Sequence, residues 1–121
     1  MKAFLAHYRQ SPRKTRLVTD LVKGKSVSEA LTTLKFLEKR AAGPIAKLIM
    51  SAAANAEKQG ENANELMIKS ITVNKGLVSK TVMPKAFGNR TLLKHRASHI
   101  DVVLAKNTKV AKVKRAKTTK K

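Results

Sequence analysis

Cysteine and tryptophan are absent from this sequence of 121 residues. The lack of cysteine excludes disulfides and thiolate metal sites, although it leaves the redox compartment undetermined. No apolar run approaches the roughly 18 residues of a membrane-spanning helix, and the apolar run at the N-terminus is too short for a signal peptide. The sequence therefore predicts a chain with no membrane span, and an intracellular location is the default.

Negative charge is also scarce. Lys and Arg number 27 against 7 Asp and Glu, which gives a formal net charge of +20. Residues 1–65 hold 12 basic and 6 acidic residues, whereas residues 66–121 hold 15 basic residues and a single acid, Asp101. Such a charge favours a polyanionic partner. Nucleic acid is the leading candidate, and an acidic membrane surface is the competitor.

A short strand and a helix are expected first in the chain. The apolar run over residues 3–8 indicates the strand. Ser11 is a favoured N-cap and Pro12 is favoured at the first helical position, so a helix is expected over about residues 13–23. Its inward face is expected to carry four aliphatic side chains: Leu17, Val18, Leu21 and Val22.

Two more helices are expected before residue 65. Ser26 and Glu29 have the spacing of a capping box, which predicts the start of a short helix. A longer helix is expected over about residues 40–59, because its apolar residues recur on one helical face. These residues are Ile45, Leu48, Ile49, Ala52, Ala53 and Ala56.

Residues 66–104 are predicted to form one long β-hairpin. Apolar residues alternate with polar ones near both ends, as in half-buried strands. They are Ile71 and Val73 in the first strand, and Ile100, Val102 and Leu104 in the second. A structureless loop between the strands would be improbable in so small a domain, so the arms are expected to continue outward and turn near residues 84–89. Nothing else in the chain could cover such arms, which indicates an anionic partner.

The last residues form a basic tail. Eight of the 17 residues in 105–121 are basic and none is acidic. A tail of this composition is expected to be disordered alone and able to order on a polyanion.

Four segments resemble, in order and spacing, the bacterial large-subunit ribosomal protein L22 family. They are SPRKTRLV at 11–18, SAAANAE at 51–57, MPKAFG at 83–88 and SHI at 98–100. The resemblance covers about residues 3–105. It implies an α+β fold with three helices packed on a small three-stranded antiparallel sheet and a long protruding β-hairpin. The expected organisation is one RNA-binding domain over residues 1–104, followed by the basic tail.

The same resemblance implies a function. The protein would be a structural constituent of the large ribosomal subunit, not an enzyme, acting in the cytoplasm within the ribosome. Its implied partners are large-subunit ribosomal RNA, whose assembly it would aid, neighbouring large-subunit proteins, and the nascent polypeptide. No cofactor and no homo-oligomer are expected. The hairpin tip would line the peptide exit tunnel with Met83, Pro84, Lys85, Ala86, Phe87, Gly88, Asn89 and Arg90.

The tip departs from the family at one position. Many family members have Arg directly after the tip glycine, where this chain has Asn89 followed by Arg90. Which side chain would face the tunnel lumen therefore stays open.

Basic side chains are the candidate RNA ligands. Lys and Arg neutralise phosphates regardless of sequence, and Arg can also stack on a splayed base. Three of them occupy the first turn of the first expected helix, where the helix dipole favours acids, which indicates a role outside folding. Plain solvation is the alternative for each. The predicted set is Arg9, Arg13, Lys14, Arg16, Lys23, Lys25, Lys39, Arg40, Lys69, Lys75, Lys80, Lys85, Arg90, Lys94, Arg96 and His99.

No metal site and no catalytic group is predicted. His95 and His99 lie among cations that would repel a divalent ion, and no cysteine is available to join them. No pattern brings a nucleophile, a base and an orienting carboxylate together. The rival function is a free-standing protein that coats or bends DNA with a basic β-arm, because composition alone does not exclude it.

Overall fold

The computed structural model describes residues 1–62 and 65–106. It confirms the predicted α+β fold, with three helices and a three-stranded antiparallel sheet. In chain order the elements are β1 (Lys2–Tyr8), α1 (Pro12–Val22), α2 (Val27–Phe36), α3 (Ala42–Glu57), β2 (Leu66–Pro84), the 3-10 turn η2 (Ala86–Gly88) and β3 (Arg90–Lys106). The tail predicted to be disordered covers residues 105–121. Its first two residues, Ala105 and Lys106, instead belong to β3, and residues 107–121 lie outside the described residues.

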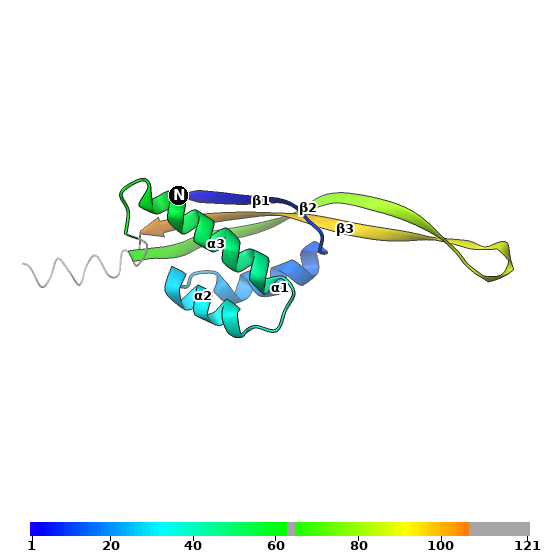
Figure 1. The fold of residues 1–121 in the computed structure, drawn as a ribbon, viewed down its shortest axis with the longest axis horizontal. Helices are drawn as coiled ribbons and strands as arrows, with labels where there is room; N and C mark the ends of the chain where they lie inside the picture. Colours follow the sequence, from blue (N-terminus) through cyan, green and yellow to red (C-terminus); the bar gives the residue numbers. More distant parts are fainter. Residues whose placement is uncertain (63–64, 107–121) are drawn as a thin grey trace, which may run out of the picture.

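The sheet has the order β1-β3-β2, so β3 is the central strand. β1 pairs with β3 only from Lys2↔Val103 to Tyr8↔Ser98. β2 pairs with β3 much farther, from Leu66↔Lys106 to Pro84↔Arg90. Beyond the end of β1 the sheet therefore has two strands, and Figure 1 shows them leaving the helices as a long twisted arm. We call residues 75–96 the arm and the three-stranded part of the sheet the base.

The base buries the residues that the sequence pattern selected. Ile71, Val73, Ile100, Val102 and Leu104 are all buried, as predicted. The six predicted core residues of α3 are buried as well, which confirms its inward face. A bulge between Ile68 and Ser70 shifts the alternation by one residue, so Leu66 and Ile68 are also buried.

Two of the four residues predicted for the inward face of α1 are not buried. Val18 and Val22 are buried, but Leu17 and Leu21 are 66% and 47% exposed. Thr15 and Thr19 take the inward positions instead, at 0% and 3% exposure. Each threonine hydroxyl donates to a carbonyl of its own helix region, that of Ser11 at 3.2 Å and that of Arg16 at 3.0 Å. These bonds remove most of the cost of burying the hydroxyls, so the helix can turn its leucines outward.

Two bulges lie where the arm leaves the base. In β1 the register shifts between Leu5 and Tyr8, and His7 adopts a positive φ of 51°. In β2 the register shifts between Lys75 and Val78. Gly76 lies in this second bulge, and a Cβ there would come within 3.2 Å of the backbone of Ala97. Because bulges bend and twist strands, this pair sets the direction of the arm.

Candidate nucleic-acid interface

The pairing register places four of the six arm cations on one face. Lys80 lies directly opposite Lys94, and Arg96 and Arg90 lie opposite Val78 and Pro84. Since cross-strand partners project from the same side and side chains alternate along a strand, these four cations share a face. The other face carries no formally charged residue. It presents Ser79, Thr81, Met83, Thr91, Leu93 and His95.

The arm contains no counter-charge for these cations. Residues 75–96 include no Asp or Glu, and within the described part of the chain no ion pair involves an arm cation. Like charges directly opposite one another destabilise a strand pair, so the Lys80–Lys94 pair is unfavourable in the chain alone. An anion that bound both lysines would offset this repulsion by its attraction to each of them.

The arm also lacks a hydrophobic cover. None of residues 75–96 is buried, and apart from Phe87 five large apolar side chains there are at least 42% exposed. They are Leu77, Val82, Met83, Leu92 and Leu93. Phe87 at the turn is 100% exposed.

The predicted tip lies at the far end of the arm (Figure 1). The turn closes through the Lys85 N–H, which donates to the Asn89 carbonyl at 2.8 Å, and the Asn89 N–H, which donates to the Ala86 carbonyl at 3.3 Å. Phe87 and Gly88 both have positive φ, 55° and 70°. Glycine adopts this conformation freely, whereas phenylalanine does so at a cost.

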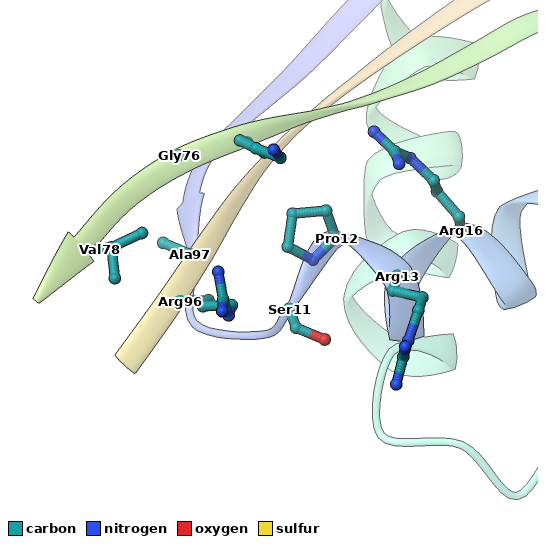
Figure 2. A pocket seen from close by; sticks show the side chains of 9 residues that line it. Ser11, Pro12, Arg13, Arg16, Gly76, Val78, Arg96 and Ala97 are labelled. Carbon is teal, nitrogen blue, oxygen red and sulfur yellow. The ribbon is translucent and has the colours of Figure 1, made fainter. Parts of the chain in front are cut away.

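A second basic group surrounds the start of α1. A cavity of about 350 Å³ opens between this helix and the root of the arm. We call it the α1–arm cavity. Figure 2 shows the start of α1 on one side and the two strands on the other. Its lining residues are Ser11, Pro12, Arg13, Arg16, Lys75, Gly76, Val78, Arg96 and Ala97.

A wider hollow adjoins this cavity. It has a volume of about 710 Å³ and shares Ser11 and Arg96 with the α1–arm cavity. We call it the outer cleft. Its other lining residues are Arg9, Gln10, Lys14, Arg40, Lys94 and His95. Eight of the predicted RNA ligands thus meet around the two hollows, although they come from the β1–α1 loop, α1, the α2–α3 loop and both arm strands.

The start of α1 adds backbone donors to this group. The Ser11 side chain makes no capping hydrogen bond, and the first turn contains no acid. The amides of Arg13 and Lys14 therefore have no carbonyl of their own helix to bond, and the helix dipole is positive at this end. The local field favours an anion here, which explains why cations in this turn are unfavourable for folding alone.

Arg16 has a fixed position within the group. Its Nε and Nη2 donate to the Val73 carbonyl at 3.2 and 2.7 Å. The guanidinium therefore ties α1 to β2, and Arg16 also lines the cavity. Arg16 is both a structural residue and a candidate ligand, a double role that spacing in the sequence does not reveal.

His99 contacts other residues of the base. Its ring stacks on Phe4 with centroids 5.9 Å apart and meets the His7 ring edge-on at 4.7 Å. The His7 backbone N–H donates to Nδ1 of His99 at 3.3 Å. These contacts support the bulge in β1, and the predicted RNA contact of His99 stays a prediction.

The remaining predicted ligands lie apart from this group. Lys25 is half-buried, and its Nζ donates to the Thr33 hydroxyl at 3.4 Å. Lys23, Lys39 and Lys69 are exposed outside the lining of either hollow. Lys85 and Arg90 flank the tip turn. Conversely, the ligand prediction omitted Gln10, whose buried Oε1 has no hydrogen-bond partner, because an isolated glutamine carries no signal in the sequence.

Tyr8 fixes one wall of this region. Its hydroxyl donates to the Arg40 carbonyl at 3.3 Å, which joins β1 to the α2–α3 loop. Burial raises the pKa of Tyr8 above its ordinary 10.0. The nearby charge of Arg40 lowers this pKa, but by less than burial raises it. The phenol therefore stays protonated and able to donate at neutral pH.

Across residues 1–62 and 65–106, no group of three His, Cys, Asp or Glu side chains could hold a metal ion. In the same part of the chain, no helix is long and apolar enough to cross a membrane.

The family model described as "Ribosomal protein L22p/L17e" matches residues 3–105. The chain belongs to this family. The protein named large ribosomal subunit protein uL22 in Syntrophotalea carbinolica is 49% identical over 104 residues, covering 85% of this chain and 94% of that one. The proteins of the same name in Pelotomaculum thermopropionicum and Citrifermentans bemidjiense are 45% and 47% identical, with similar coverage.

Family membership decides the class of function. The chain is a ribosomal protein with a structural role and is not an enzyme. Its place of action is the ribosome of the cytoplasm. The resemblance inferred from the four sequence segments is therefore confirmed.

Proposed function

We propose that this protein is a structural constituent of the large ribosomal subunit that binds large-subunit ribosomal RNA with its arm and with the two hollows at the start of α1. The names of its relatives support the subunit. The observation that carries the RNA contact is the Lys80–Lys94 pair, two like charges in direct opposition on an arm without acids. Backbone phosphates are the anions that ribosomal RNA supplies along its whole length.

The geometry favours RNA phosphates over scattered anions. Strand neighbours are about 4.8 Å apart and alternate residues along a strand about 6.6 Å apart, so Arg96, Lys94 and Lys80 form one cluster, and Arg90 lies about 13 Å beyond it, past the uncharged Val82–Leu92 pair. Cations at these spacings follow a phosphate backbone. Each neutralised phosphate releases a counterion, which makes the binding strong and dependent on salt.

A salt titration tests this function. The full chain is bound to fragments of large-subunit ribosomal RNA and, in parallel, to duplex DNA of equal length. We expect tight binding to one or a few RNA fragments, with affinity falling by about a thousandfold between 50 and 200 mM salt if some six phosphates are contacted. Equal affinity for duplex DNA and for every RNA fragment would favour the rival β-arm DNA-binding function instead.

We further propose that the arm carries its tip to the wall of the peptide exit tunnel, next to the nascent polypeptide, and that the protein contacts neighbouring large-subunit proteins and aids early assembly of the RNA. The support is the family resemblance together with the exposed turn at the end of an arm with no cover of its own. A density map of the assembled large subunit is the direct test. A tip embedded in RNA away from the tunnel would contradict this role.

A further inference from the structure

The α1–arm cavity differs from the rest of the basic surface because it is a recess with both charged and apolar walls. Pro12, Val78 and Ala97 supply apolar surface. Arg13, Lys75 and Arg96 supply charge, and none of the lining residues is acidic. A flat phosphate-binding surface needs no such recess, so the cavity indicates a ligand with an apolar or planar part as well as an anionic part.

The volume of the cavity limits what can enter. About 350 Å³ lies at the small end of the range of ligand sites, roughly 300–1,000 Å³. An RNA duplex cannot enter a recess of this size, whereas one unstacked nucleotide can. Proteins that read RNA commonly take in splayed bases of this kind and stack them on aromatic rings or Arg guanidinium planes.

Arg16 provides a plane that is already ordered. Two hydrogen bonds to the Val73 carbonyl, at 3.2 and 2.7 Å, hold its guanidinium in place before any ligand arrives. Binding then loses little side-chain entropy at this residue. All three arginines are exposed, and Arg13 and Arg96 lie outside any ion pair within residues 1–62 and 65–106, so these two are free to bond a phosphate at the rim.

We propose, resting on the proposed RNA-binding function, that the α1–arm cavity receives a single splayed nucleotide of the large-subunit RNA. The nucleobase lies against Arg16 and the apolar wall of Pro12 and Val78, and the phosphate of the same nucleotide lies at the rim on Arg13 and Arg96. The bulge at Gly76 shapes the recess, because a side chain at this position would press on Ala97 and His99 at 3.2 Å. The protein thereby binds the RNA at one chosen nucleotide as well as along its phosphates.

A pair of phenylalanine variants tests the proposal. V78F places a ring at the cavity without removing a charge. V82F adds the same ring to the same face of the arm, four residue pairs farther out and not in the cavity lining. Both variants keep all cations, so the salt slope of RNA binding is expected to equal that of the unchanged protein.

The readouts are affinity for the large-subunit RNA fragment and chemical reactivity of each base with and without protein. We expect the unchanged protein and V82F to alter the reactivity of one unpaired nucleotide in the same way. V78F is expected to lose this signal and to bind about tenfold more weakly, within the range of one lost base stack.

Two outcomes would overturn the nucleotide site and leave the proposed function standing. One is that V78F matches V82F in affinity and reactivity pattern. The other is that the unchanged protein binds with a steep salt dependence but alters no unpaired base. A protein that fails to bind large-subunit RNA at all would overturn both proposals.

A measurement on the unchanged full chain does not depend on the folding of V78F. Adenosine monophosphate and inorganic phosphate are titrated separately while backbone amide shifts are followed by NMR. The nucleotide is expected to shift the amides of Gly76, Val78 and Ala97, which phosphate leaves in place, whereas both ligands shift Arg13 and Lys14. Identical shifts from the two ligands would mean a plain anion site and would overturn the insertion of a base.

Discussion

β2 and β3 run through two regions with opposite physical character. In the base they bury alternate residues under the helices, and Ile68, Ile100 and Val102 are fully buried. In the arm the same two strands, paired by the same backbone hydrogen bonds, bury no side chain. A two-stranded ribbon by itself is only marginally stable in water. Backbone pairing thus gives the arm its shape, while the chain supplies burial, the main source of stability, only to the base.

The comparison is sharpest for large apolar residues in the two regions. Ile100→Ala is expected to lower the free energy of unfolding by about 2–5 kcal/mol, because it opens a cavity in the centre of the core. Leu92→Ala, at a site 56% exposed in the arm, is expected to change it by less than about 0.5 kcal/mol. Urea unfolding measures both. Similar losses for the two variants would mean that the arm has a core of its own.

The two regions are also expected to differ in order in the free protein. Backbone NMR order parameters should be about 0.85 in the base and below about 0.6 across residues 80–94. RNA should raise the arm values if it supplies the missing contacts. Rigid values in the free arm would remove the argument that a partner is needed.

Removal of the opposed lysines separates binding from folding. The double variant K80A/K94A is expected to reduce the salt slope of RNA binding by about 1.5 units, since two phosphate contacts are lost. Its stability should stay equal or rise by a few tenths of a kcal/mol, because like charges no longer face each other.

The control for this variant is K35A/K47A, which removes two exposed helix lysines outside the predicted ligand set. The control variant K35A/K47A has the same net charge as K80A/K94A. Equal reductions of the slope by both double variants would show that overall charge, and not the position of the arm cations, governs binding.

Arg16 and Arg13 lie one helical turn apart and are expected to respond differently. Arg16→Ala should cost about 1 kcal/mol of stability, because it removes the two bonds that join α1 to β2. Arg13→Ala should leave the stability unchanged and reduce the salt slope by about 1 unit. Thermal unfolding and a salt titration on each variant check this. A stability loss in Arg13→Ala would show that it, too, holds the fold together.

The smallest effect on folding is expected at the tip. Gly88 has a φ of 70°, which a β-branched residue disfavours, so Gly88→Val should change the shape of the turn. The melting temperature should stay within error, because the tip contacts no core. If the tip lines the tunnel, ribosomes that carry the variant should respond differently to tunnel-binding macrolide antibiotics. An unchanged response, with the variant protein present in the particle, would leave the arm with an anchoring role only.

Much of the fold was readable from the sequence. Ser26 and Glu29 form the predicted capping box at the start of α2, and the apolar positions of α3 gave its buried face. The alternation near Ile71 and Ile100 gave the strands of the hairpin. These features were predictable because each depends on residues close together in the chain. The prediction that Leu17 and Leu21 lie in the core was wrong. Thr15 and Thr19 take the inward positions instead, because the hydroxyl of each threonine finds a backbone carbonyl nearby in the chain to bond.

The sequence by itself determined the charge, the segregation of that charge into an arm without acids, and the family. Only the tertiary structure decided which cations meet. The opposition of Lys80 and Lys94 depends on the strand register, which the turn and the bulges fix over many residues. The α1–arm cavity joins Arg13 to Arg96, 83 positions away, and Gly76, in the bulge of β2, also lines it. Such juxtapositions arise from long-range pairing, and no local pattern in the chain encodes them.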